Sequence, residues 1–416
     1  MINEKRQWQL LEKIGFSRVG GSKEEKKAAQ ILKETIEKTG NGAFIEEFEV
    51  DWQKVNKASL KTADKEYNVT AYYQCANTPE DGLRAPFYYL STDNAVGIKN
   101  CEGKIVLVNG YLNMKTYEKL LEGKAVGFIT FSGELKEARE VTDLENRELR
   151  SPQREKGNIP GVHMTIHDAM ELVLENPEEV TLNVQQETFK IKSQNVVTEI
   201  KGEINPDEII VFTAHYDSVE YSSGVYDNGA GSVILMELYY HFLNNRPNRT
   251  IRFVWCGSEE RGLLGSLYHV KNNEDTIGKV VLNINVDVAG PVLGSDVAVV
   301  TGPESLVNYI DYLAKEEGFE IKVSQDIYSS DNMPFASKGI PTVSFARFGG
   351  KGTSYIHDRY DQLFFMDSKN LYRTAEFVRV FAQRMINGYV FPVPREMPEN
   401  MVKKVEEYVT DRLINK

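Results

Sequence analysis

The chain has 416 residues, of which 41% are hydrophobic and 26% are charged, a composition typical of globular proteins with room for two or three domains. Lys and Arg total 49 against 61 for Asp and Glu, so the net charge is -12, which argues against a nucleic-acid partner. No segment is apolar for long enough to span a bilayer, and the amino-terminal MINEKRQWQLLEKIGF lacks the apolar core of a secretory signal. Three widely spaced cysteines indicate reduced thiols. We therefore expect no membrane association and a cytoplasmic location.

The first part of the chain predicts a helix followed by a strand. The segment from Lys23 to Gly40 has apolar residues at helical spacing and ends at a glycine that can serve as C-cap, and AFIEEFEV then reads as a strand. Residues 55–190 have a different texture, with short apolar strands such as KIVLVNG and AVGFITFSG and one helix near MKTYEKLLEG. We expect this stretch to form a small β-rich domain inserted between residues 1–54 and 191–416 of one α/β domain.

After Ser193 strands, loops and helices alternate regularly. Near-continuous apolar strands between amphipathic helices predict an α/β sheet with helices on both faces. The segments are EIIVFTAHYD, GSVILMELYYHFLNN, TIRFVWCGSEE, LLGSLYHVKNN, KVVLNINVDVAG, DVAVVTG, ESLVNYIDYLAKEEG, IPTVSFAR and KNLYRTAEFVRVFAQRMING.

Polar residues of metal-ligand type lie just beyond the apolar strands, where ligands bind in such folds. They are His215, Asp217, Glu259, Glu260, Asp287 and His357, joined by Asp227 from the loop before the helix that begins at GAGS. Carboxylates that lose water beside one another repel strongly, and a pair of divalent cations removes that cost. Imidazole and carboxylate suit zinc, and two metals about 3.5–4 Å apart form a common hydrolytic clamp.

Spacing assigns finer roles only in part. His215 and Asp217 are two residues apart on a strand, so their side chains leave the same face, as expected of a ligand and the carboxylate that orients it. Glu259 and Glu260 are adjacent and diverge, so one can bind metal while the other faces the attacking water. Spacing leaves open which does which.

A family resemblance rests on the ordered segments HYD, YDNGAGS, SEERG, NVDVAG, SSDNMPFASKGIPT and IHDRYD. In order and in the element each occupies, they resemble the M28 family of dinuclear zinc aminopeptidases, and the likeness extends to IGFSRVGGSKEEKKAAQIL near the amino terminus. It covers roughly residues 1–50 and 190–390, while residues 55–190 resemble, more weakly, a protease-associated domain inserted in many members. The resemblance implies a mixed, mostly parallel central sheet.

Carried over residue by residue, the resemblance implies two zinc ions per chain, with Co2+ or Mn2+ as other suitable metals. It implies that His215 and Asp287 bind one zinc and that Glu260 and His357 bind the other. Asp227 would bridge the two ions.

The same resemblance implies Glu259 as the general base and Asp217 as the partner that orients His215. It also implies a cis peptide after the bridging aspartate, at Asp227-Asn228. Such a bond costs about 3–4 kcal/mol and is kept only where the surrounding site holds it.

Two departures from the family pattern concern the last histidine. Ile356 stands where several such aminopeptidases have a tyrosine that polarises the substrate carbonyl, and Tyr355 is one position away. The family's HTP-type sequence is changed after His357, although Asp361 still matches the downstream aspartate. The group that fills the tyrosine's role stays open.

Several other residues have a structural interpretation that we prefer. His163 and His167 have the spacing of a zinc helix but lack the accompanying glutamate, and Thr165 to Asp168 fits a capping box. Cys256 lies in an apolar strand and is expected to be a packing residue.

The glycines of GAG, residues 229–231, fit a tight helix start better than a phosphate loop. Arg347 and Lys351, near the expected site, are interpreted as solvated loop charges. The other interpretation, binding of a substrate carboxylate, stays open for them.

These observations predict a zinc-dependent exopeptidase that acts on peptides, with Glu259 moving the proton between water and the leaving amine. An acidic pocket suits a free α-ammonium group, which favours aminopeptidase activity. The alternatives are a dipeptidase or glutamate-type carboxypeptidase, for which Arg347 is the relevant feature, and a binding module that has lost catalysis. The oligomeric state is not predicted.

Overall fold

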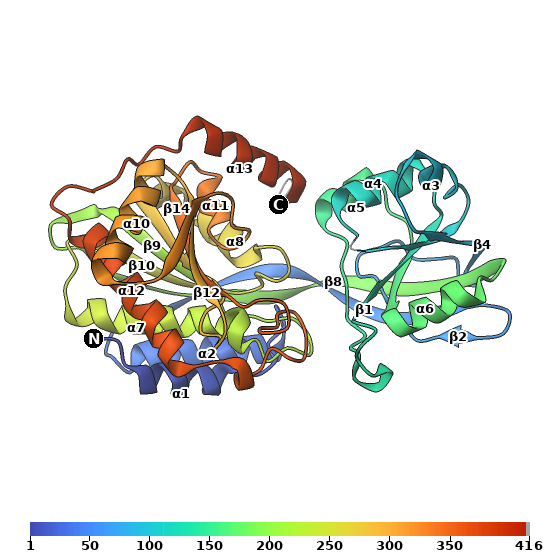
Figure 1. Cartoon of the computed structure of the whole chain (residues 1–416), viewed down its shortest axis with the longest axis horizontal. Helices are drawn as coiled ribbons and strands as arrows, with labels where there is room; N and C mark the ends of the chain where they lie inside the picture. Colours follow the sequence, from blue (N-terminus) through green and yellow to red (C-terminus); the bar gives the residue numbers. More distant parts are fainter. Residues whose placement is uncertain (111, 413–416) are drawn as a thin grey trace. The chain divides into compact units, whose positions relative to one another are not determined.

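The structure, a computed structural model, describes residues 1–110 and 112–412, with side chains through residue 410. Its contacts divide it into two compact units, one formed by Met1–Val50 and Ile191–Thr410 and the other by Asp51–Lys190 (Figure 1). Two long strands, β1 (Phe44–Lys61) and β8 (Glu179–Ile200), belong to both units. The contacts divide β1 near residue 50, whereas the sequence expectation placed that boundary at residue 54.

The first unit is built on a mixed, mostly parallel sheet, as the sequence predicts. Its strands lie in the order β13-β12-β14-β11-β9-β10-β8. The four central strands are mutually parallel, β12 runs antiparallel to β14, and β8 runs antiparallel to β10. The strands after β8 are β9 (Asn205–His215), β10 (Arg249–Cys256), β11 (Val280–Val286), β12 (Ser295–Thr301), β13 (Ile321–Gln325) and β14 (Thr342–Phe348).

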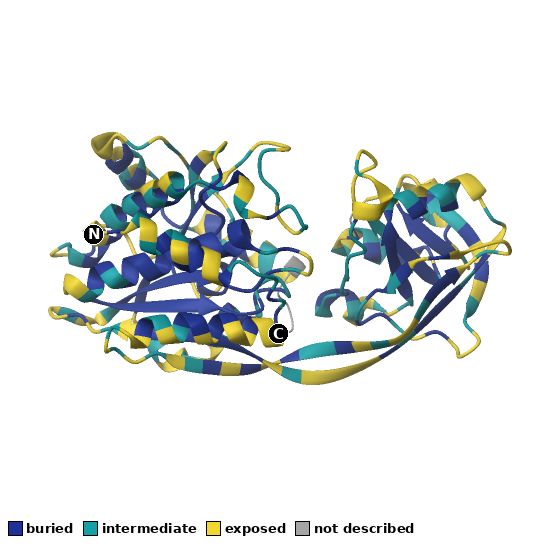
Figure 2. Ribbon diagram, turned by 90° about the horizontal axis from the view of Figure 1, so that it is seen from below, coloured by how far each residue is buried: buried dark blue, intermediate teal, exposed yellow. Residues whose placement is uncertain are grey.

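Two hydrophobic clusters show that helices cover both faces of this sheet. Along β9, Phe212 belongs to the larger cluster and Val211 to the smaller one, because successive strand residues point to opposite faces. The larger cluster includes residues of α1 (Glu4–Ile14), α2 (Lys23–Glu37), α7 (Ala230–Asn244), α10 (Glu304–Glu317) and α12 (Ser368–Asn387). The smaller cluster includes residues of α8 (Leu264–Asn272) and α11 (Met333–Ala336). The predicted two-faced α/β arrangement is therefore confirmed, and Figure 2 shows its buried strands in dark blue.

The capping of α2 determines which of its residues faces inward. The side chain of Ser22 accepts a hydrogen bond from the Glu25 main-chain N–H at 3.0 Å, so the helix begins at Lys23. Glu25 then lies in the first turn and is buried, while Glu24 is exposed. The helix ends at Glu37, three residues before the glycine expected to close it.

The second unit has its own hydrophobic core, and its strands follow β8 in the hydrogen-bonded order. Its strands lie in the order β8-β4-β5-β6-β7-β3, and β4 to β7 are parallel to one another. Four described α-helices accompany these strands, so the unit contains more helix than the single one that the sequence predicts. The elements are β2 (Glu66–Tyr67), β3 (Val69–Ala71), β4 (Leu83–Leu90), α3 (Ala95–Lys99), β5 (Ile105–Val108), α4 (Met114–Glu122), β6 (Gly127–Ser132), α5 (Ser151–Lys156), β7 (Gly161–Thr165) and α6 (Ile166–Glu175).

The histidine pair of the second unit is structural. His163 lies on β7 and is buried, with its ring nitrogens 2.7 Å from Thr130 Oγ1 and 2.9 Å from Ser132 Oγ. Thr165 accepts the Asp168 main-chain N–H at 3.2 Å and caps α6. Because His167 lies on the helix and His163 on the strand, the pair does not form a helical metal motif, and the capping interpretation is confirmed.

Four short helical segments and one charged terminal helix complete the description: α9 (Glu274–Ile277), the 3-10 helices Arg139–Val141 and Leu363–Phe365, the π-helical turn Val225–Gly229, and α13 (Glu399–Arg412). A search of the described residues finds no helix with the length and hydrophobicity needed to cross a bilayer.

The second unit can be removed to test its independence. Val50 and Ile191 approach the same point, since a Cβ atom added at Gly21 would lie 3.1 Å from Val50 Cγ2 and 2.5 Å from Ile191 Cδ1. We expect a chain in which a short Gly-Ser linker replaces residues 51–190 to unfold in one cooperative thermal transition and to bind the same amount of zinc as the full chain. Circular dichroism and metal analysis measure both quantities. A chain that does not fold would show that the second unit is part of the first unit's core.

Candidate metal centre

The structure brings the predicted ligand side chains together at the carboxyl ends of the parallel strands. Among the described residues, two groups have ligand atoms that all lie within 4.8 Å of one another and share Asp227. One group is His215, Asp227 and Asp287, and the other is Asp227, Glu260 and His357. A third group joins His215 to Glu259 and Glu260. All six side chains therefore belong to one site.

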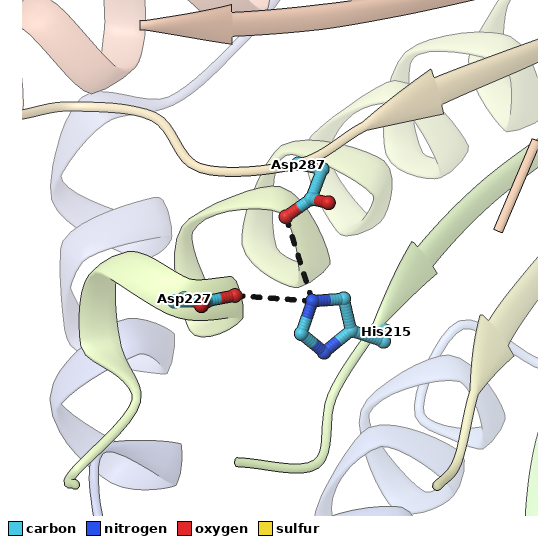
Figure 3. A group of neighbouring side chains, drawn as sticks. All are labelled: His215, Asp227 and Asp287. Carbon is cyan, nitrogen blue, oxygen red and sulfur yellow. Dashed lines mark ion pairs between the residues drawn. The ribbon is translucent and has the colours of Figure 1, made fainter. Parts of the chain in front are cut away.

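The first group is formed by two strand ends and a turn (Figure 3). His215 is the last residue of β9, and Asp287 follows the last residue of β11. His215 Nε2 lies 3.2 Å from Asp227 Oδ1 and 3.4 Å from Asp287 Oδ1. The same ring nitrogen therefore faces both carboxylates, which is the arrangement expected around a shared cation.

The second group uses the other oxygen of Asp227. His357, from the loop after β14, places Nε2 at 3.1 Å from Asp227 Oδ2 and at 3.1 Å from Glu260 Oε2. Glu260 comes from the turn that follows β10. Asp227 thus presents Oδ1 to one group and Oδ2 to the other, as a bridging carboxylate does.

Asp227 is fixed by main-chain hydrogen bonds to Asp361. The N–H groups of Tyr226 and Asp227 donate to the Asp361 carboxylate at 2.9 and 3.1 Å. The side chain of Asn228 donates to Val286 O at 2.8 Å and so joins this turn to β11. The Asp227-Asn228 peptide is cis, as the family resemblance implies. The downstream aspartate thus acts on the backbone that carries the shared carboxylate.

Asp217 faces both the end of β9 and the turn that follows β10. Its Oδ1 is 3.5 Å from His215 Nδ1, on the expected side of the ring but beyond the usual hydrogen-bond length of about 3 Å. Its two oxygens accept the main-chain N–H groups of Glu259, at 3.0 Å, and of Glu260, at 3.2 Å. Asp217 therefore orients the turn that carries the two glutamates as well as facing the histidine.

The charges of the site fit a bound cation pair. Burial alone would lower the pKa of the His215 imidazole, but Glu259, Asp217 and the neighbouring carboxylates raise this pKa well above its ordinary value. Burial raises the pKa of Glu259 in the same site. Within the described chain, Glu260 Oε1 and Asp287 Oδ1 are buried without a hydrogen-bond partner. Buried acceptors of this kind are satisfied by divalent cations, and the nitrogen and oxygen donors suit zinc.

Two residues outside the predicted set also shape the site. Arg18 is completely buried and donates to the main-chain carbonyls of Tyr216, Ser223 and Gly224, so it holds the loop between His215 and Asp227. Burial lowers the pKa of Arg18 to about 10, which leaves it cationic at neutral pH. The only sequence signal for this role was its position in the motif IGFSRVGG.

Tyr328 is the second such residue. It donates its hydroxyl to Asp287 O at 3.2 Å, and its ring stacks on Phe348 with centroids 6.2 Å apart. Tyr355, the nearest tyrosine by sequence, donates instead to Gly352 O at 3.3 Å. No pattern in the sequence indicated Tyr328, which lies in the loop after the short edge strand β13.

The interpretation of Arg347 as a solvated charge was wrong. Its side chain is only 11% exposed and pairs with Asp296, with Nη1 to Oδ2 at 2.5 Å. The two residues are direct partners in the antiparallel pairing of β12 with β14, and Arg347 also donates to Pro291 O at 3.0 Å. Its guanidinium is therefore engaged within the sheet. Lys351 is exposed, as expected.

Asp217→Asn tests the double role of Asp217. Both carboxylate oxygens accept main-chain N–H groups, so the amide of asparagine must turn its NH2 toward one of these donors. We expect zinc affinity or activity to fall about 10–100-fold, the usual effect of losing a residue that orients metal ligands. Zinc titration measures this, and Asp311→Asn on the exposed face of α10 serves as the matched control. Wild-type affinity in Asp217→Asn would contradict the assignment.

The chain is similar to known peptidases. The family model described as Peptidase family M28 matches residues 195–382. Aminopeptidase YwaD of Bacillus subtilis is 29% identical over 350 residues, which cover 81% of this chain and 73% of that protein. Leucine aminopeptidase 2 of Trichophyton equinum is 30% identical over 201 residues, which cover 46% of this chain and 38% of that protein.

Solved structures agree with the fold. BSAP, a zinc aminopeptidase from Bacillus subtilis, superposes with a TM-score of 0.78 at 22% identity, over 96% of this chain and 99% of that one. An aminopeptidase from Aneurinibacillus sp. strain AM-1 gives a TM-score of 0.73 at 20% identity, over 96% and 98% of the two chains. The match to Peptidase family M28 over residues 195–382 contains every residue of both metal-ligand groups, so the part of the chain that carries the site is similar to that family.

Proposed function

We propose that this chain is an aminopeptidase that holds two zinc ions and removes amino-terminal residues from peptides. The observation that carries the proposal is Asp227, whose two carboxylate oxygens face two separate groups of ligand atoms. One ion would be held by His215 and Asp287 and the other by Glu260 and His357. Similarity to a peptidase family over residues 195–382, and relatives named as aminopeptidases, support the activity.

The chain's own residues divide the work of hydrolysis. Zinc ions, when bound, supply Lewis-acid polarisation of the scissile carbonyl and acidify water. Glu259 lies beside both ligand groups and is not needed to join them, so it is the carboxylate free to take a proton from the attacking water. It then returns this proton to the leaving amine. Asp217 accepts hydrogen bonds from the main-chain N–H groups of Glu259 and Glu260 and thereby fixes the positions of the base and its neighbouring ligand.

An amino-terminal preference follows from the excess of acidic groups. Five carboxylates, those of Asp217, Asp227, Glu259, Glu260 and Asp287, gather around two imidazoles, and a free α-ammonium group suits such a pocket. Arg347, the feature that left a carboxypeptidase open, is paired with Asp296 inside the sheet. The structure therefore offers no observation that favours recognition of a terminal carboxylate by Arg347.

The proposal also covers the type of the inserted domain and the location of the protein. We assign residues 55–190 to a protease-associated-like domain, supported by a hydrophobic core of their own. We also keep the prediction of a cytoplasmic location, which agrees with three cysteines that are free thiols in the structure.

Glu259→Gln and Glu260→Gln separate the two roles. Positioned proton transfer contributes about 10²–10⁴-fold in rate, so Glu259→Gln should lower kcat at least about 10²-fold while both zinc ions stay bound. Glu260→Gln removes a charged ligand and should lower zinc occupancy as well. Stopped-flow or steady-state kinetics with metal analysis measures both effects. The opposite pattern, with zinc lost only from Glu259→Gln, would exchange the two roles.

Substrate polarity is tested with two peptide types. The zinc-loaded chain should cleave an aminoacyl arylamide that has a free α-amine, and blocking that amine should lower kcat/KM by at least about 100-fold, because the charge that suits the acidic pocket is gone. Chromatographic analysis of the products measures this ratio. Cleavage restricted to an amino-blocked peptide with a free carboxylate would identify a carboxypeptidase instead.

A further inference from the structure

We propose that Glu25, in the first turn of α2, is a positioning residue for the proposed base Glu259. Its carboxylate accepts hydrogen bonds from Ser258, in the turn that leads directly into Glu259 and Glu260. The inference rests on the proposed function, because it gives a purpose to the orientation of Glu259. Glu25 itself touches neither group of metal ligands.

The Glu25 carboxylate is completely buried and is saturated with donors. Oε1 accepts the main-chain N–H of Ser258 at 3.0 Å, and Oε2 accepts the main-chain N–H of Gly21 at 2.7 Å. The hydroxyl of Ser193 and the amide of Gln194, both on β8, add hydrogen bonds of 2.9 and 3.2 Å. A side chain from the amino-terminal segment therefore ties β8 to the turn after β10.

The hydrogen bonds from Ser258 to Glu25 matter because the Ser258 backbone is in the left-handed region. Its φ is +54°, a conformation that residues other than glycine rarely adopt. The space around the turn is also full, since a Cβ atom at Gly257 would lie 2.4 Å from Gln194 O and 2.7 Å from Glu25 Oε1. The turn is held in a costly conformation by close neighbours on one side and by the carboxylate on the other.

Three successive main-chain N–H groups of this turn end on buried carboxylates. Ser258 N donates to Glu25, and the N–H groups of Glu259 and Glu260 donate to Asp217. Burial, and then the nearby Asp217 carboxylate, raises the pKa of Glu25 to about 8. Glu25 and Asp217 thus lie near each other, and both bind the backbone that presents the glutamate pair.

Glu25→Gln tests the proposal with a single-atom change. Each carboxylate oxygen accepts a main-chain N–H, whereas an amide has one oxygen, so its NH2 must face the donor of Gly21 or of Ser258. We expect kcat on an aminoacyl arylamide to fall about 10–100-fold, with KM changed less than about 2-fold and zinc content unchanged. Glu24→Gln makes the same chemical change at the exposed neighbouring residue and should keep wild-type kinetics.

A second measurement does not depend on activity. In the metal-free protein, hydrogen exchange followed by mass spectrometry should show the amides of residues 258–260 exchanging about 10-fold faster or more in Glu25→Gln than in wild type or Glu24→Gln. Adding Ser258→Gly to Glu25→Gln should recover several-fold of the lost kcat, since glycine adopts positive φ without strain. A merely global loss of stability would not be repaired by this substitution.

The outcomes distinguish this inference from the proposed function. Wild-type kcat and slow exchange in Glu25→Gln overturn the inference, and so does a change confined to KM. Wild-type protein that cleaves no arylamide overturns the proposed function. Hydrogen exchange then still tests whether Glu25 holds the turn at Ser258. If Glu25→Gln does not fold, Glu25→Asp replaces it, because the shortened carboxylate cannot span Ser258 N and Gly21 N together. Wild-type kcat in Glu25→Asp then overturns the inference.

Discussion

Electrostatic repulsion among buried carboxylates is the constraint on which the centre of this protein depends. Asp217, Asp227, Glu259, Glu260 and Asp287 gather around two histidines at one edge of the sheet, a combination that cations between the acids would stabilise. The backbone also holds acids in place. Asp217, Asp361 and Glu25 each accept two main-chain N–H groups.

The proposed metal ligands and their supports form two layers with different chemistry. The ligand layer consists of side chains at strand ends and in the loops and turns that follow them, which the parallel sheet brings to one edge. The supporting layer consists of acids, and of the buried Arg18, that act on loop backbone. Arg18 binds carbonyls of the loop between His215 and Asp227, and Asp361 binds N–H groups of the turn that carries Asp227. The positions of the ligands are therefore set by residues that bind no metal.

The ligand layer could be predicted from the sequence because its signal is local. An acid or histidine close after an apolar strand has one place to go in a parallel sheet, so His215, Asp287 and the pair Glu259 and Glu260 were placed at this edge without knowing their partners. The local signal did not separate the roles of the two glutamates. The supporting layer has no such signal. Glu25 looks like any charged residue of an amphipathic helix until the cap at Ser22 decides which way it faces, and the pairing of Arg347 with Asp296 depends on the register of two strands that are far apart in sequence. The contacts divide β1 near residue 50, whereas the sequence places the boundary at residue 54, because β1 runs unbroken through this region.

The shared carboxylate and its supports come from distant parts of the chain, and this order matters during synthesis. Asp227 is made more than 130 residues before Asp361, to which its turn is tied, and its second histidine partner is residue 357. Glu25, in α2, is made more than 230 residues before Ser258, its partner in the turn after β10. A ribosome-bound chain therefore lacks a complete hydrolytic centre until about six sevenths of the sequence has been made, counting residue 361 of 416. The fold thus delays the appearance of peptidase activity until the surrounding sheet is present to confine it.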